Sequence, residues 1–368
     1  MTNDRFKVAL HRAVGLENDG AFFEAEQIYQ QLLRQNANIE MLHYMYAQFL
    51  LRKGEYRAAW PHFLKRVEDT VYKERSAARL SKPYWDARDP DAEAGQTILI
   101  YADQGLGDML MCARFLPAVA ARFEKTVFMV YPGFRALLSS LPPEIEVIEF
   151  GDPLPAFDVH ADLFSVPALL DVLPETLPSP KCLSIDPSHI DAWRAGLDPS
   201  RLNVGLCWRG NPNHMRDAER SARLADFRPL LDTGAVFHCL QVGDALQEID
   251  DLPDTLQLVV HRKISESVDA ETGKMIDTAA LASCMDLVIS VDTAVVHLAG
   301  ALGLPLWIFV PKCPDWRFMM DVEFSPWYPE SRIFRCKERY DWSHPVAEAR
   351  RRLMHMVAEK AQGRPVTP

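Results

Sequence analysis

The stretch Asp286–Gly303 (DLVISVDTAVVHLAGALG) places a short apolar run directly before a helical pattern. Leu287–Val291 is rich in β-branched residues, which suits a strand buried on both faces of a parallel sheet. Apolar residues then recur at helical spacing as far as Gly303, a residue type typical of a helix C-terminus. Another apolar run, Leu306–Val310, follows. The sequence therefore predicts a strand–turn–helix–strand unit, which favours an α/β fold.

The turn of this unit carries Asp292-Thr293, and His297 lies one helical turn further on. A helix N-terminus has unpaired N–H groups and a partial positive charge, so it is a natural seat for a phosphate. Thr293 adds a hydroxyl and His297 a further hydrogen-bond donor. Alternatively, Asp292 is only the N-cap and His297 an ordinary helix residue.

The composition is that of a globular protein: the chain has 368 residues, 48% of them hydrophobic and 25% charged. The net charge of −11 argues against general binding to nucleic acid. No apolar run is long enough for a transmembrane segment, and the first residues lack the apolar core of a signal peptide, so we expect a cytoplasmic protein. The seven cysteines are scattered, and neither a zinc site nor a disulfide framework is predicted.

Two segments near the N-terminus repeat at an offset of 34 residues, DGAF at 19–22 and KGEY at 53–56. The other matched pairs are Ala13 with Ala47, Ala25 with Ala59, and Tyr29 with Phe63. This period, with glycine between helices and alanine at their crossing point, resembles the tetratricopeptide repeat. A third helix pair would begin within residues 60–80, and so short an array is expected to dock on the rest of the chain. A generic helical bundle is the alternative.

A second strand–turn–helix unit begins with the strand expected at Thr97–Ala102, followed by the turn DQGLGD and a helical pattern through about Arg122. The turn is glycine-rich, but Leu110 stands where the dinucleotide fingerprint has its third glycine, and there is no Walker lysine.

Strands and helices alternate over the rest of the chain, which predicts parallel sheets. Further strands are expected at 126–131, 145–150, 157–160, 203–208, 236–241, 256–260, 287–291, 306–310 and 332–335. A break near 186–200 divides them into two sheets. Ligands of open α/β sheets bind at the carboxyl ends of the strands, where the loops after residues 102, 208 and 291 all lie. We therefore predict two Rossmann-like domains with a cleft between them.

The loop over residues 209–221 (RGNPNHMRDAERS) brings several arginines into an otherwise acidic protein. The planar guanidinium of arginine matches phosphate oxygens. Arg216 and Arg223 are expected to form local salt bridges. The candidate ligand contacts in this loop are Arg209, Asn211, Arg220 and Ser221.

Four motifs occur in order between about residues 83 and 345: YADQGLGDMLMCARFLP, CWRGNPNH…RS, SVDTAVVHLAGALGLPLW and PDWRF…SPWYP…RIFR. Together they resemble proteobacterial glycosyltransferase-like proteins that join tetratricopeptide repeats to a domain related to the ADP-heptose:lipopolysaccharide heptosyltransferases. The resemblance implies a GT-B fold, with the nucleotide-sugar donor bound mainly by the second Rossmann-like domain and the acceptor mainly by the first. It implies no metal and no cofactor apart from the donor substrate. The implied divisions are helical repeats over 1–80, an acceptor domain over 81–186, a nucleotide-sugar domain over 187–343, and a helix with a tail over 344–368.

The resemblance also assigns roles to residues. Asp108 matches the aspartate proposed in that family as the general base, which takes the proton of the acceptor hydroxyl; capping its helix is the structural alternative. Asp292, Thr293 and His297 match the donor-phosphate segment. Gln241 ends a strand and is a candidate for contact with the base or ribose. The predicted donor- and phosphate-binding residues are Gly105, Gly107, Arg209, Asn211, Arg220, Ser221, Gln241, Asp292, Thr293, His297 and Arg317.

One departure from the family is the missing lysine of the second loop, for which Arg220 is the candidate replacement. The leading hypothesis is an inverting, metal-independent glycosyltransferase whose repeats present a protein acceptor such as flagellin. The alternatives are a non-catalytic scaffold with a degenerate transferase fold and a lipopolysaccharide heptosyltransferase. ADP-heptose, a CMP-linked nonulosonic acid and a UDP-hexose all stay open as donors.

Overall fold

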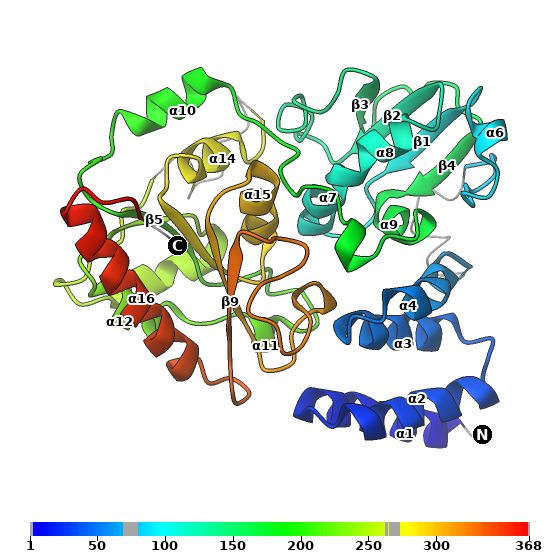
Figure 1. Ribbon diagram of the computed structural model, residues 1–368, viewed down its shortest axis with the longest axis horizontal. Coiled ribbons are helices and arrows are strands. Elements are labelled where there is room, and N and C mark those ends of the chain that lie inside the picture. The colour runs from blue at the N-terminus through cyan, green and yellow to red at the C-terminus, as the bar shows by residue number, and fades with distance from the viewer. Residues whose placement is uncertain (1–2, 69–79, 262–263, 265–272, 367–368) are drawn as a thin grey trace.

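The computed structural model describes residues 3–68, 80–261, 264 and 273–366. It consists of a helical N-terminal segment and two parallel sheets with their helices (Figure 1). Part of the third helix pair predicted within 60–80 and the last residues of the tail lie outside these ranges. The predicted α/β class, with parallel sheets behind a helical segment, is confirmed.

The helical segment consists of α1 (Asn3–Asp19), α2 (Phe22–Gln35), α3 (Glu40–Arg52) and α4 (Tyr56–Phe63), followed by the short 3₁₀ helix η1 (Leu64–Glu68). The residues matched at the 34-residue offset occupy equivalent places. Gly20 and Gly54 both have positive φ between paired helices, as glycine allows. The buried members of the matched pairs are Ala13, Ala47, Ala25, Ala59, Tyr29 and Phe63. The repeat seen in the sequence is therefore a repeat of packing positions.

The first sheet has the strand order β3-β2-β1-β4, with all neighbours parallel. Its strands are β1 (Thr97–Tyr101), β2 (Lys125–Val130), β3 (Ile145–Glu149) and β4 (Val159–Asp162). The accompanying helices are α6 (Pro90–Glu93), α7 (Leu106–Cys112), α8 (Leu116–Ala120) and α9 (Val166–Leu169). The helix predicted through Arg122 is thus split into α7 and α8 by a short 3₁₀ turn at Ala113–Phe115.

The second sheet has the order β6-β5-β7-β8-β9, again parallel throughout. Its strands are β5 (Asn203–Cys207), β6 (Val236–Cys239), β7 (Leu287–Val291), β8 (Leu306–Val310) and β9 (Ser331–Arg335). Its helices are α10 (Pro187–Arg194), α11 (Asp217–Arg220), α12 (Arg228–Leu231), α14 (Ile276–Ala282), α15 (Ala294–Leu302) and α16 (Ser343–Ala361).

The strand predicted at 256–260 was wrong. Within this segment, Val259 makes an isolated bridge with His238, beside the edge strand β6. Val259 and Val260 are 39% and 45% exposed, so the apolar run is not buried on two faces as the prediction assumed.

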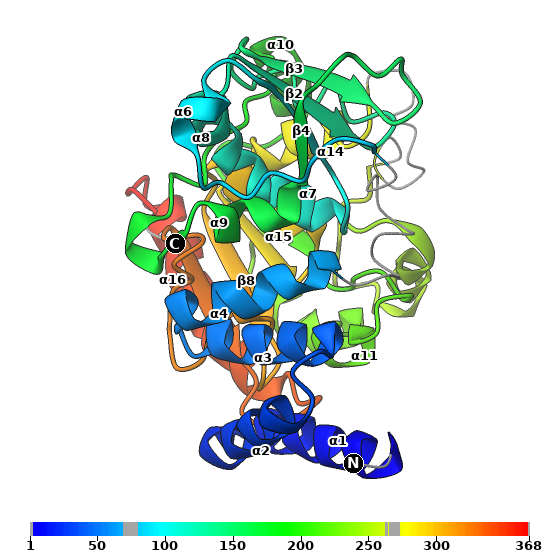
Figure 2. The same cartoon turned by 90° about the vertical axis from the view of Figure 1, so that its right-hand side faces the viewer.

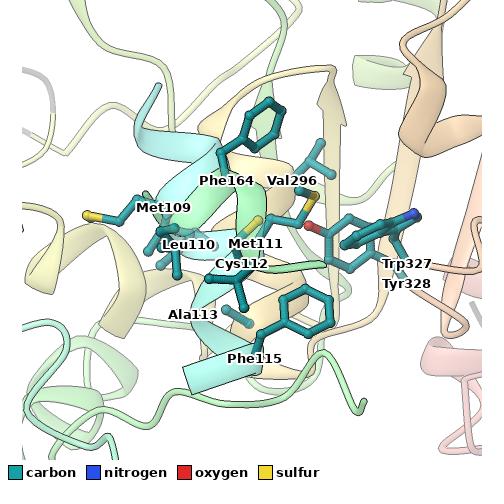
Figure 3. Close-up of a cluster of buried hydrophobic side chains, with 14 of the residues drawn as sticks. Met109, Leu110, Met111, Cys112, Ala113, Phe115, Phe164, Val296, Trp327 and Tyr328 are labelled. Atoms are coloured by element: carbon teal, nitrogen blue, oxygen red, sulfur yellow. The ribbon is translucent and has the colours of Figure 1, made fainter. Parts of the chain in front are cut away.

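The half built on the first sheet and the half built on the second sheet meet where α7 packs on α15. An added Cβ at Gly107 would overlap the ring of His297, so the helices touch here without an intervening side chain. Figure 3 shows the apolar side chains of α7 beside Val296 of α15 and Trp327 and Tyr328 of the segment before β9. The start of α7 and the start of α15 are thereby brought to the same place.

The helical segment is fastened to both halves. Figures 1 and 2 show α3 and α4 next to the α/β body, with α1 and α2 outside them. Trp60 of α4 donates from Nε1 to the Val172 carbonyl of the first half at 2.7 Å. Arg52 of α3 donates from Nε to the Pro314 carbonyl of the second half, also at 2.7 Å. The predicted docking of this segment is confirmed. No helix in the described ranges is both long and apolar enough to cross a membrane.

Candidate functional site

A cleft of about 940 Å³ lies between the two sheets, at the carboxyl ends of their strands. In each sheet the strand order reverses beside the first strand of that sheet: β1 lies between β2 and β4, and β5 between β6 and β7. Such reversal points open a crevice that binds ligands in parallel α/β sheets. The loops after β1, β5 and β7 all line the cleft.

The structure brings nearly all the predicted site residues together in this cleft. Those that line it are Gly105, Gly107, Asp108, Arg209, Asn211, Arg220, Gln241, Asp292, Thr293, His297 and Arg317. Ser221 stands behind the described lining residues, where its hydroxyl accepts from the Gly210 N–H at 2.9 Å and donates to Asp217 at 2.7 Å. Ser221 therefore shapes the second loop from behind.

Asp108 both caps α7 and forms an ion pair. Its Oδ2 accepts the Gly105 N–H at 3.0 Å, and its Oδ1 is paired with the guanidinium of Arg317. Burial raises the pKa of Asp108, and the charge of Arg317 opposes that rise. The capping role considered as an alternative is thus real, and it orients the carboxylate toward the second half of the molecule.

Arg317 lies at the centre of a group of carboxylates. Its guanidinium reaches Asp315 at 2.6 Å as well as Asp108, and its carbon lies 4.7 Å from the centre of the Trp316 ring. Burial alone would raise the pKa of Asp315, but Arg317 holds it below its usual range. Arg317, predicted to bind the donor phosphate, is paired in the structure with two carboxylates of the protein itself.

At the start of α15, Thr293 and not Asp292 is the N-cap. The Thr293 hydroxyl accepts the Val295 N–H at 3.2 Å and lies 3.0 Å from the Ser290 hydroxyl. The carboxylate of Asp292 makes no hydrogen bond within the described part of the chain and lines the cleft. Burial, with the nearby charge of Asp315, raises the pKa of Asp292 to about 6. Thr293 thus fixes the helix start while Asp292 faces the ligand space.

His297 is buried between the two helices. Its Nδ1 is hydrogen-bonded to the Tyr328 hydroxyl, and its ring lies against Gly107. Burial holds the pKa of His297 well below its usual range, with the charge of Arg317 acting in the same direction. It is therefore a neutral imidazole, and among the described residues none bonds its Nε2, which leaves that nitrogen for the cleft.

Two side chains, Arg220 and Gln241, hold the second loop in place by hydrogen bonds. Arg220 donates to the Asp292 carbonyl at 3.0 Å and so ties the second loop to the start of α15. The Gln241 Oε1 accepts the N–H groups of Trp208 and Arg209 at 3.2 and 2.9 Å. The Gln241 Nε2 donates to the Val242 carbonyl at 3.0 Å, and its second N–H is the group left for a base or ribose contact.

The remaining cationic side chains of this loop are in local ion pairs. Arg209 is paired with Glu248 at 3.2 Å, and Arg216 with Glu219 at 2.9 Å. Arg223 lies 4.0 Å from Asp226. The local salt bridges predicted for Arg216 and Arg223 are present. The Asn211 side chain, by contrast, bonds within the described chain only to the Asn213 N–H and is otherwise open to the cleft.

Sequence reasoning missed several lining residues that come from other elements, among them Tyr44, Gln48 and Lys274. Tyr44 and Gln48 belong to α3 of the helical segment, and Lys274 precedes α14. The Lys274 Nζ lies 5.6 Å from the centre of the Phe134 ring, across the cleft from its own sheet. No local motif marks any of these residues, because docking of distant segments places them here.

No family model matches the chain. It is 27% identical over 357 residues to Protein FlbA of Caulobacter vibrioides, a match that covers 87% of this chain and 56% of that protein. The chain thus spans about half the length of the curated relative it matches. Among solved structures it is similar to E. coli ADP-heptose lps heptosyltransferase II, with a TM-score of 0.49 and 15% identity over 73% of this chain and 99% of that one. A family 9 glycosyl transferase from Veillonella parvula has a TM-score of 0.47 and 12% identity over 66% of this chain and 86% of its own.

The arrangement suits the binding of an anion beside a group that accepts a proton. The N-terminus of α15 offers the partial positive charge of a helix start, and Arg220 adds a guanidinium on the same side. Asp108, from the half built on the first sheet, lines the same cavity. A ligand with a phosphate end and a reactive centre can therefore contact both halves at once.

Proposed function

We propose that the chain is a glycosyltransferase that moves a sugar from a nucleotide-sugar donor to an acceptor held in the cleft. The observation that carries the proposal is the single cavity of about 940 Å³ that is lined by both Asp108 and Thr293. Its halves would correspond to the two domains of a GT-B fold, over residues 81–186 and 187–343.

The donor diphosphate would lie at the start of α15. The backbone there, capped by Thr293, presents N–H groups to an anion, and Arg220 supplies a positive charge beside it. As the sugar leaves, negative charge builds up on the diphosphate, and these groups would stabilise it without a metal ion. His297, Asn211 and Arg209, which line the same cavity, would add hydrogen-bond donors around these phosphates.

The acceptor hydroxyl would react on the side of Asp108. Its oxygen forms a bond to the anomeric carbon while the bond from that carbon to the diphosphate breaks, so the configuration is inverted. The proton of the hydroxyl passes to the Asp108 carboxylate, and the nucleotide leaves with the bonding electron pair. Burial raises the pKa of Asp108, which favours its accepting a proton, and the charge of Arg317 opposes that rise and favours the ionised form.

The helical segment is consistent with two tetratricopeptide repeats, because the residues at the 34-residue offset share their packing positions. We propose that the acceptor is a protein, such as a flagellin, and that the reaction takes place in the cytoplasm.

A thermal-shift screen tests the proposal. The full chain is melted with nucleoside diphosphates and with ADP-, UDP- and CMP-linked sugars. A nucleotide present at 100 times its Kd should add about 2.7 kcal/mol to the free energy of unfolding. Stabilisation by one nucleotide class, followed by release of that nucleotide from its sugar, supports the transferase. A chain that responds to none of them would instead be a non-catalytic scaffold.

A further inference from the structure

The helical segment contributes directly to the wall of the cleft. Tyr44 and Gln48 are four residues apart on α3, so they project from the same face of that helix, and both line the cavity. The Tyr44 ring packs on Phe63, with ring centres 5.5 Å apart. In the described part of the chain, neither the Tyr44 hydroxyl nor the Gln48 amide makes a hydrogen bond. Two polar groups are therefore left open to the ligand space.

The position of α3 relative to the reactive carboxylate is fixed. Its last residue, Arg52, bonds the Pro314 carbonyl through its side chain, and its own carbonyl accepts the Met320 N–H at 3.1 Å. These two bonds flank the segment that carries Asp315 and Arg317. Since Arg317 is paired with Asp108, α3 is linked to the proposed base through one intermediate side chain.

The charges around Tyr44 agree with this placement. Burial is the main reason why the pKa of Tyr44 is raised to about 12, and the charges of Arg66, Arg317 and Asp108 also act on it. Its hydroxyl therefore keeps its proton and serves as a neutral donor and acceptor.

The two sides of the cleft differ in charge. The described lining residues with positive side chains are Arg209, Arg216, Arg220, Lys274 and Arg317, and all of them belong to the half built on the second sheet. The side made by α3 and the loop after β1 carries Tyr44, Gln48, Gln104 and Asp108, which supply hydroxyl, amide and carboxylate groups. Arg317 of the other half and Arg66 of η1 partly offset the charge of Asp108, but the nearby Asp315 carboxylate adds negative charge, which a second anion on that side would also meet.

We infer that α3 forms the acceptor subsite and that this subsite binds the acceptor through a neutral, hydroxyl-bearing group. Tyr44 and Gln48 hold that group by hydrogen bonds while its hydroxyl faces Asp108. The inference rests on the proposed function and deepens it: the helical segment selects the acceptor inside the cleft, and the selection is against anionic acceptors. The proton and the sugar move as described for the transfer itself.

The test uses matched small acceptors with the full chain and the nucleotide sugar found by the thermal-shift screen. N-acetylserine amide is the neutral probe, and N-acetylserine, which differs by its carboxylate, is the anionic one. Methyl glucoside in a parallel arm distinguishes a sugar acceptor from a peptide acceptor. Nucleotide release without any probe gives the rate of transfer to water, and mass spectrometry identifies the glycosylated probe.

The variants are Tyr44→Phe and Gln48→Ala, with Tyr46→Phe as the control. Tyr46 lies on the same helix, but its hydroxyl is near Glu26 and Gln30 at 3.5 Å and does not belong to the described lining of the cleft. Loss of a hydrogen bond to a neutral group should raise the KM for the neutral probe about three- to tenfold. Tyr46→Phe should keep the wild-type KM, kcat and rate of nucleotide release to water.

Transfer to either neutral probe, with the increased KM in both α3 variants, supports the inference. Equal use of N-acetylserine by the wild type overturns it, and so does a wild-type KM in both variants. Release of nucleotide without transfer to any neutral probe also overturns it, while the proposed function stands. Absence of both nucleotide binding and release overturns the proposed function together with the inference.

Discussion

The two strand–loop–helix units whose helices pack together beside the cleft, β1–α7 and β7–α15, are built alike but differ in the role of their acidic residue. In the first unit Asp108 lies inside the helix start, where it caps α7 and is paired with Arg317. In the second unit Thr293 caps α15, and the Asp292 carboxylate is left to the cleft.

The difference shows how one local geometry can serve two chemistries. A carboxylate that is capped and ion-paired is oriented and ionised, which suits a group that receives a proton. A helix start capped by a neutral hydroxyl keeps its partial positive charge, which suits an anion. The contrast predicts that changes in the first unit affect the rate of reaction and changes in the second unit affect the binding of nucleotide.

The largest expected effect is that of Asp108→Asn. An amide cannot accept the proton of the acceptor hydroxyl, so sugar transfer should fall by a factor of about 10² to 10⁴. Nucleotide binding, measured by calorimetry, should change little. Asp89→Asn is the control, because Asp89 also caps a helix, α6, by accepting the Ala92 N–H at 3.1 Å. Transfer at nearly the wild-type rate in Asp108→Asn would remove Asp108 from the mechanism.

The next largest effect tests the contact that brings the two units together. In Gly107→Ala the new methyl group would overlap the His297 ring, so α7 and α15 have to separate. The free energy of unfolding should fall by about 1–3 kcal/mol, as in other overpacked cores. In Gly95→Ala the added methyl group meets nothing within 4 Å, so denaturant unfolding should show no comparable loss. Equal free energies of unfolding for the two variants would show that α7 and α15 can separate enough to accommodate the methyl group at little cost.

A smaller effect is expected from Thr293→Val, which removes the cap of α15. The cost of losing a cap is about 1 kcal/mol, and the helix start that binds the diphosphate becomes less ordered. The Kd for the nucleoside diphosphate should rise about fivefold, with kcat affected less. Thr293→Ser keeps the hydroxyl and should restore the affinity. Failure of serine to do so would place the role of Thr293 in its methyl group.

The smallest effect concerns pH and Asp292. Its pKa is raised to about 6 in the folded protein, whereas an unfolded aspartate has its usual value of 3.8. Between these values the folded state binds more protons, so the free energy of unfolding decreases as pH rises from about 4 to about 6. Relative to Asp292→Asn, the wild type should lose on the order of 1 kcal/mol over this range in denaturant titrations. A constant difference between the two proteins would mean that Asp292 ionises normally.

Much of the fold could be predicted from the sequence, because the central strands are apolar on both faces. Leu287–Val291 and Leu306–Val310 have their predicted bounds, and every residue in them is buried. The segment 256–260 has a similar composition, but a residue run becomes a strand only where it pairs along its length with a neighbouring strand. Here only Val259 forms a bridge, to His238 of the edge strand β6. The composition of a segment does not show which strands will lie beside it, so the strand predicted at 256–260 was wrong.

The site was predictable where loop position alone determines it. Asp108, Arg220 and Thr293 follow strands whose carboxyl ends meet at the cleft, so their approach to one another follows from parallel topology. Tyr44 and Gln48 reach the cleft only because a hairpin some distance away in the chain docks there. Similarly, the Gln241 side-chain oxygen accepts two backbone N–H groups because of tertiary contacts, which the spacing of residues in the sequence does not show.

The anchoring of the helical segment has a consequence for motion. Arg52 of α3 and Trp60 of α4 lie in one helical hairpin and donate to carbonyls that belong to the two different halves of the molecule. If the two halves swing apart, the hairpin has to release one of these carbonyls and travel with the other half. The hairpin therefore links the two halves, and the cleft can open wider only if one of these two hydrogen bonds breaks.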